Sequence, residues 1–148
     1  MKLKLDIDAL NDDFFENAKL LGISTTVKNY KLCWQLNNLL GFNFRLNNEL
    51  EIRLLKRKNK KEREYFFSIY ESRETANTLV HYLYHNQYEG EYLLPEFRNI
   101  DFLWLMKGDI VENEKVDDIK NAIKNIYDVQ LVTELTNEKI KNKGNMVF

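Results

Sequence analysis

The sequence predicts an α+β domain: an antiparallel or mixed sheet of about five to seven strands with two principal helices packed on it. Strand-like segments cluster between two isolated helical patterns. The 148 residues are 44% apolar, enough for one hydrophobic core and too few for two. With 5 Gly and 1 Pro, the sequence has no linker-like stretch. Residues 1–148 are therefore expected to form a single domain.

The first segments of the chain follow two different patterns. Residues 2–8 alternate charged and apolar side chains, which predicts a strand or an extended N-terminal arm. The segment Phe14–Ile23 fits a helix at its beginning and a short strand containing Gly22 at its end. Both assignments stay open for this segment.

A helix is predicted over residues 27–40. Hydroxyl side chains at positions 24–26 can cap its first N–H groups, and Gly41 can end it in a left-handed conformation. One broad apolar face of this helix should pack on the sheet, and it contains Leu32, Cys33, Leu36, Leu39 and Leu40.

A second apolar row, formed by Val27, Tyr30 and Trp34, lies on the other side of the same helix. One sheet cannot cover both rows. In one interpretation, Phe14 and Phe15 or the N-terminal arm fold over the second row within the monomer. In the other, the row is an interface with a protein partner or with a second copy of the chain.

The middle of the chain reads as a series of antiparallel strands. Alternating side chains over residues 42–46 and 50–54, on either side of Asn47 and Asn48, predict a hairpin. Aromatic and β-branched residues at 65–70 and 78–85 predict two further strands.

The last third of the chain reads as strand, helix and strand. The nearly continuous apolar run Ile100–Met106 predicts a central strand that is covered on both faces. Residues 114–126 place Val116, Ile119, Ile123 and Ile126 on one helical stripe, and Val129–Leu135 resumes a strand. Any parallel crossover in this β-α-β unit should be right-handed. Residues from 137 onward are expected to be loosely held.

The segment around the single proline, LPEFRNIDF, resembles a known sequence motif. It is similar to that of the uncharacterised bacterial family named for the motif IPExxxVDY, whose six specified positions are occupied here by Leu94, Pro95, Glu96, Ile100, Asp101 and Phe102. The resemblance implies a compact cytoplasmic bacterial protein and assigns no catalytic residue. Phe102 lacks the phenolic hydroxyl of the family's tyrosine.

Glu96 and Asp101 admit two interpretations. Paired carboxylates can perform acid–base chemistry or hold a divalent ion, but an oxygen-ligand site needs more donors than two. The favoured interpretation is structural. Asp101 would accept backbone N–H groups at the entrance of the strand, and Glu96 would do so within the turn or pair with Arg98.

The other residues that could bind a metal or act as a nucleophile are also expected to have structural roles. His81 and His85 lie on a predicted strand, where four residues of rise place them about 13 Å apart, too far to share a metal ion. Cys33 lies within the apolar helical face and is expected to be buried packing. The sequence has no glycine-rich phosphate loop, nucleophile elbow or Cys-x-x-Cys pair, so we expect no cofactor and no metal site.

Charge gives no general attraction to a partner. The formal net charge is −1, so nucleic-acid or membrane binding would need a local patch. The basic run between residues 56 and 63 lies next to Tyr65–Phe67, and its favoured interpretation is a solvated hairpin loop. Its alternative role is contact with RNA, through Lys56, Arg57, Lys58, Lys60 and Lys61.

These observations favour a non-enzymatic cytoplasmic interaction or regulatory domain. The single cysteine and the lack of a signal-peptide pattern are typical of a reducing compartment, and no apolar run is long enough to cross a membrane. The expected partner is a protein or a second copy of the chain. The alternative function is an RNA-associated accessory protein that uses the basic run.

Overall fold

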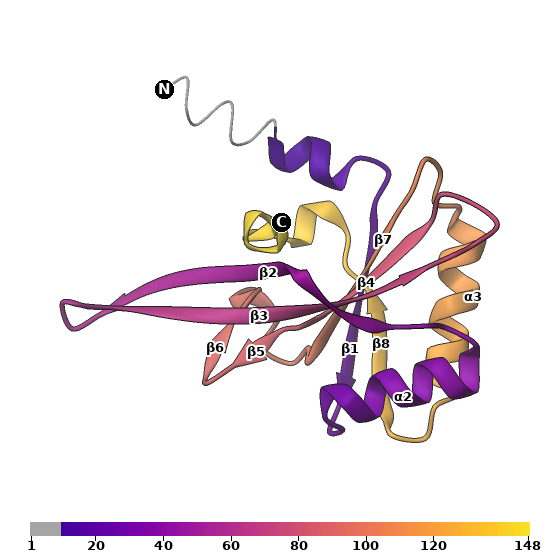
Figure 1. The fold of residues 1–148 in the computed structure, drawn as a ribbon, viewed down its shortest axis with the longest axis horizontal. Helices are drawn as coiled ribbons and strands as arrows, with labels where there is room; N and C mark the ends of the chain where they lie inside the picture. Colours follow the sequence, from indigo (N-terminus) through magenta and orange to yellow (C-terminus); the bar gives the residue numbers. More distant parts are fainter. Residues whose placement is uncertain (1–9) are drawn as a thin grey trace.

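The computed structural model describes residues 10–148 and has the predicted α+β architecture (Figure 1). Its main sheet has six strands in the order β2-β3-β4-β7-β1-β8, and every neighbouring pair is antiparallel. The elements are β1 (Lys19–Thr25), α2 (Asn29–Leu40), β2 (Arg45–Lys58), β3 (Lys61–Arg73), β4 (Val80–His85), β5 (Gln87–Tyr88), β6 (Glu91–Tyr92), β7 (Phe102–Lys107), α3 (Asn113–Lys124) and β8 (Val129–Glu134). The short strands β5 and β6 form a second sheet, which the sequence did not predict.

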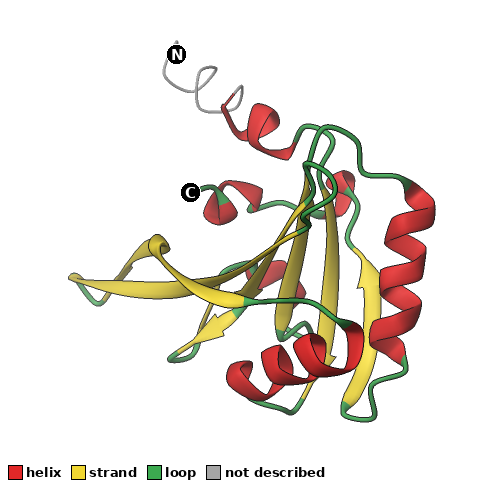
Figure 2. Cartoon of the chain, turned by 45° about the vertical axis from the view of Figure 1, so that its right-hand side comes forward, coloured by secondary structure: helices red, strands yellow, loops and turns green. Residues whose placement is uncertain are grey.

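The main sheet is apolar on both sides, so two apolar clusters form, one on each face, where the sequence analysis expected a single core. The helix face is the side on which α2 and α3 pack (Figure 2). There Leu36 and Ile123 are fully buried in one cluster with Trp104. The tail face carries Tyr84 and Leu105, and residues 10–15, the segment 93–100 and the C-terminal turns cover it. Strand β7 is buried on both faces, as its continuous apolar sequence predicted.

The β7-α3-β8 unit has one feature that the sequence did not reveal. Strand β1 lies between β7 and β8 and is antiparallel to both, so β7 and β8 are parallel without being neighbours. Gly22 lets the Ile100 side chain pack directly on β1, because a Cβ atom at this position would lie 3.0 Å from that side chain. Residues 10–15 are helical and β1 begins at Lys19, so both assignments for Phe14–Ile23 are confirmed in part. The prediction for residues 2–8 lies outside the described residues.

Helix α2 ends as predicted but is not capped as predicted. Gly41 adopts a φ of 77° and its N–H bonds to the Leu36 carbonyl. Ser24 and Thr25 belong to β1, where their hydroxyls donate to the carbonyls of Asn99 and Asp128 at 2.5 and 2.7 Å. The helix therefore begins at Asn29, after Lys28, without a side-chain cap. The prediction that Leu39 packs on the sheet is also wrong, because Leu39 is exposed.

The predicted hairpin at Asn47 and Asn48 is wrong. Both residues lie inside β2, at an irregularity where the pairing with β3 shifts register between Leu46 and Glu51. The turn lies at Asn59 and Lys60, which both have positive φ, as a two-residue hairpin turn requires. Strands β2 and β3 thus extend through most of the basic run. Their outer ends, on either side of the turn at Asn59 and Lys60, project from the body as an arm (Figure 1).

The C-terminal segment is held firmly, which contradicts the expectation of a loose tail. Met146 is fully buried on the tail face, and its carbonyl accepts a hydrogen bond from the Tyr84 hydroxyl at 2.9 Å. The Asn145 amide donates to the Leu93 carbonyl at 2.8 Å. Within the described residues, no helix has the length and apolar character needed to cross a bilayer.

Candidate functional site

The motif segment 94–102 is organised by a residue that the sequence analysis missed. Asn86 follows β4 and is completely buried. Its amide nitrogen donates to the carbonyls of Phe97 and Ile100 at 3.0 and 2.9 Å, and its amide oxygen accepts the Leu94 N–H at 2.8 Å. Every polar group of this side chain is therefore used to shape the turn. No local pattern could have revealed this, since the partners lie 8 to 14 residues away.

The apolar motif residues pack into the two apolar clusters. Leu94 and Ile100 are buried on the tail face, and Phe102 is buried on the helix face. The Phe102 ring stacks on His85 with centroids 4.9 Å apart. Pro95 opens a short 3-10 turn, where its missing N–H leaves no hydrogen bond unmade.

The two motif carboxylates bind to different parts of the backbone. Asp101 accepts the Thr25 N–H at 2.9 Å. Glu96 accepts the N–H groups of Lys141 and Asn142 at 2.6 and 2.7 Å, and so anchors the C-terminal segment. Burial alone would raise the pKa of Glu96, but the donated hydrogen bonds outweigh this effect and lower it. The two carboxylates therefore hold different segments of the backbone and do not converge on a common site.

The buried His81 belongs to a hydrogen-bonded chain that crosses the helix face. The Trp104 indole N–H donates to His81 Nδ1 at 3.0 Å, and His81 Nε2 lies 2.6 Å from Glu74 Oε2. Lys115 of α3 donates to the same carboxylate at 3.2 Å. Both ring nitrogens of His81 are occupied, so neither is free to act as a base or a metal ligand. In the described part of the chain, no three His, Cys, Asp or Glu side chains are placed to hold a metal ion.

Cys33 is buried on the helix face, where α2 packs on the sheet. Burial raises the pKa of its thiol to about 12, because the apolar surroundings disfavour the thiolate. The thiol therefore lacks the reactivity of a catalytic nucleophile.

The second apolar row of α2 is largely open. Tyr30 and Trp34 are 68% and 61% exposed, whereas Val27 is half-buried against the core. The interpretation that Phe14 and Phe15 cover this row is wrong, because both rings pack on the tail face, on the opposite side of the sheet. The alternative that the N-terminal arm covers it lies outside the described residues. The exposed row therefore consists of Tyr30 and Trp34.

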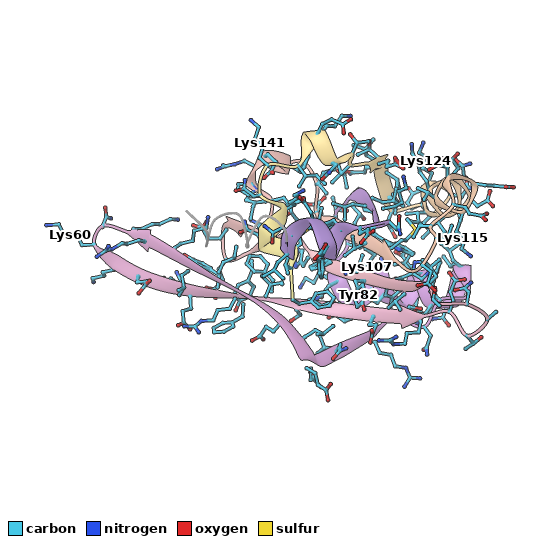
Figure 3. The ribbon with its side chains drawn as sticks, turned by 90° about the horizontal axis from the view of Figure 1, so that it is seen from above. Lys60, Tyr82, Lys107, Lys115, Lys124 and Lys141 are labelled. Atoms are coloured by element: carbon cyan, nitrogen blue, oxygen red, sulfur yellow. The ribbon has the colours of Figure 1, made fainter. Side chains whose placement is uncertain are left out.

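The basic run is divided between the two faces of the arm. Cross-strand pairing sets Lys56 opposite Arg63 and Lys58 opposite Lys61, and side chains two residues apart share a face. Arg57 pairs across from Glu62 on the other face. Lys60 stands in the turn at the tip (Figure 3). Of the five predicted contact residues, three share a face, and Arg63 joins them there.

Neither a scan against models of known protein families nor a search of the curated proteins found a match to this chain. The likeness of residues 94–102 to the IPExxxVDY motif therefore stays a prediction. The geometry therefore leaves three candidates for a functional site: the motif turn, the exposed row of α2 and the arm.

Proposed function

We propose that this protein is a non-enzymatic interaction domain that binds another protein through the exposed row of α2. The observation that carries the proposal is the exposure of Tyr30 and Trp34 on a helix whose opposite face is fixed in the core. Trp and Tyr are the residues that most often dominate binding energy at protein interfaces.

The surroundings of the row have the composition of an interface. Lys28, Lys31 and Asn38 provide polar side chains at its margin, and a polar rim around an apolar centre is typical of protein interfaces. Asp128 lies 3.7 Å from the Lys31 ammonium and accepts a hydrogen bond from Gln35, which attaches the loop before β8 to the helix.

The loop attached to α2 in this way carries a further exposed aromatic side chain. Tyr127 directly precedes Asp128 and is 99% exposed.

The residues with catalytic potential support the same proposal. Glu96 and Asp101 hold backbone N–H groups, and His81 is saturated with hydrogen bonds inside the core. Each of these groups stabilises the fold, so the exposed aromatic row is the surface with the clearest capacity to act on another molecule.

The test compares Trp34→Glu with Leu39→Glu. Leu39 is as exposed as Trp34 but lies on a different side of α2, so it is a matched control. Sedimentation velocity over a wide range of concentration measures self-association, and affinity capture with both variants measures binding of other proteins. We expect Trp34→Glu to weaken association by roughly 30-fold, equivalent to about 2 kcal/mol, while Leu39→Glu leaves it unchanged.

Two outcomes would contradict the proposal. One is a wild-type protein that stays monomeric and captures no protein in a Trp34-dependent manner. The other is equal loss of binding in both variants. Circular dichroism of each variant shows that the fold is retained, which is expected because both side chains are exposed.

A further inference from the structure

The two faces of the arm differ sharply in charge. One face, which we call the basic face, carries Lys56, Lys58, Lys61 and Arg63 as two directly opposed pairs. On the other face, Arg57 is opposite Glu62, and Arg53 forms an ion pair with Glu64. Like charges directly opposite each other destabilise a hairpin, so the basic face has a cost that the other face avoids.

An acidic turn lies beside the basic face. It consists of residues 89–91: Glu89 and Gly90 join β5 to β6, and Glu91 begins β6. Both carboxylates reach the arm, where Glu91 forms an ion pair with Lys58 and Glu89 forms one with Arg63. The hydrogen bond from Lys58 lowers the pKa of Glu91, so the carboxylate is charged at neutral pH. Lys56 and Lys61 have no carboxylate within ion-pair distance among residues 10–148. The acidic turn thus neutralises half of the basic face.

An exposed aromatic ring adjoins the same surface. Tyr88 is 43% exposed and directly precedes the acidic turn. Its ring lies 6.2 Å from that of Phe67, which shares a strand face with Arg63. Cations that follow a phosphate backbone, together with an aromatic ring on which a base can stack, are the two components of single-strand binding sites.

We propose that the basic face and Tyr88 bind a single-stranded nucleic acid, and that Glu89 and Glu91 restrain this binding by pairing with Lys58 and Arg63 in the free protein. Phosphate groups replace the two carboxylates when the strand binds. The overall charge of −1 gives no general attraction, so binding depends on this local face. The inference is independent of the proposed function, because the arm projects from the body away from α2 (Figure 1).

Fluorescence anisotropy with a labelled oligouridine measures the interaction directly. Four phosphate contacts predict a slope of log K against log salt of about −2.8, which is about a 50-fold loss of affinity between 50 and 200 mM salt. The double variant Lys56→Gln with Lys61→Gln should reduce the slope to about −1.4. Arg57→Gln is the matched control, because it removes a charge of the same sign from the opposite face and should leave the slope unchanged.

Substitutions in the acidic turn should change the affinity in the opposite direction. Glu89→Gln with Glu91→Gln should increase the affinity by about 3- to 10-fold, since exposed ion pairs are individually weak. Tyr88→Ala should lower the affinity for oligouridine while leaving the salt slope unchanged, because stacking does not release counterions. Thermal melting of each variant verifies that the fold is retained.

Several results would overturn the inference. Absence of oligouridine binding by the wild type at low salt refutes it directly. A reduced salt slope in Arg57→Gln would show a response to net charge instead of to the basic face. An unchanged affinity after removal of both glutamates would refute the restraint. Stronger binding to duplex RNA, or to phosphatidylserine vesicles, would assign the surface to a different anion.

Discussion

Asn86→Ala tests whether a single buried amide organises the motif turn. The substitution leaves the Leu94 N–H and the carbonyls of Phe97 and Ile100 without their partner. A buried polar group that loses its hydrogen bond costs about 1–3 kcal/mol, and water that enters the vacated space recovers part of this. We therefore expect the free energy of unfolding to fall by about 3–5 kcal/mol.

Urea denaturation, followed through the fluorescence of the buried Trp104, measures this change. The expected loss corresponds to a decrease in melting temperature of roughly 10 °C for a chain of this size. Asn38→Ala is the control, because Asn38 is exposed and bonds only to a carbonyl of its own helix, so its loss should cost less than about 0.5 kcal/mol. A change below about 1 kcal/mol for Asn86→Ala would refute the role assigned to this amide.

Three further predictions concern the tail, the buried histidine and the second helix. Glu96→Gln should accelerate hydrogen exchange at Lys141 and Asn142 while leaving β7 protected, and uniform exchange would contradict the anchoring role. Burial lowers the pKa of His81, so the unfolded chain takes up its proton first, and the free energy of unfolding should decrease as the pH falls below the ordinary value of 6.5. This decrease should be smaller in His81→Phe, and an identical pH profile would exclude the histidine as its source. Ile123→Ala should cost about 2–4 kcal/mol in urea denaturation, and a cost near zero would contradict its full burial.

The elements that were predicted correctly are those whose apolar residues follow a simple pattern along the sequence. The helical stripe around Ile123 and the apolar run of β7 each gave the correct element, because burial on one face or on two leaves a direct trace in the sequence. The position of Gly41 likewise gave the end of α2. Together with the strand-like segments between the two helices, these features explain why the fold class was predicted correctly.

The errors arose where distant residues decide the structure. Asn47 and Asn48 have typical turn chemistry, but the residues on either side of them pair with β3, so both stay inside β2. The turn falls instead at Asn59 and Lys60, within a charged run. The anchoring of the tail depends on Glu96, whose partners lie 45 and 46 residues away. Such contacts have no signature in a single sequence. The ion pairs between the basic face and the acidic turn could not be predicted for the same reason.

The position of β1 between β7 and β8 has a consequence for how the chain folds. Strands β2, β3 and β4 are joined by short connections and can pair as soon as they are synthesised. Strand β1 precedes them in the chain, yet its pairing partners lie about 80 to 110 residues later, as in Lys19 with Met106 and Thr25 with Val129. Closing such long loops is slow, because the entropic cost comes before any contact forms. During synthesis, Leu21 and Ile23 therefore stay without their final neighbours until the last strand has emerged, and this interval is when the chain is most exposed to aggregation and to chaperones.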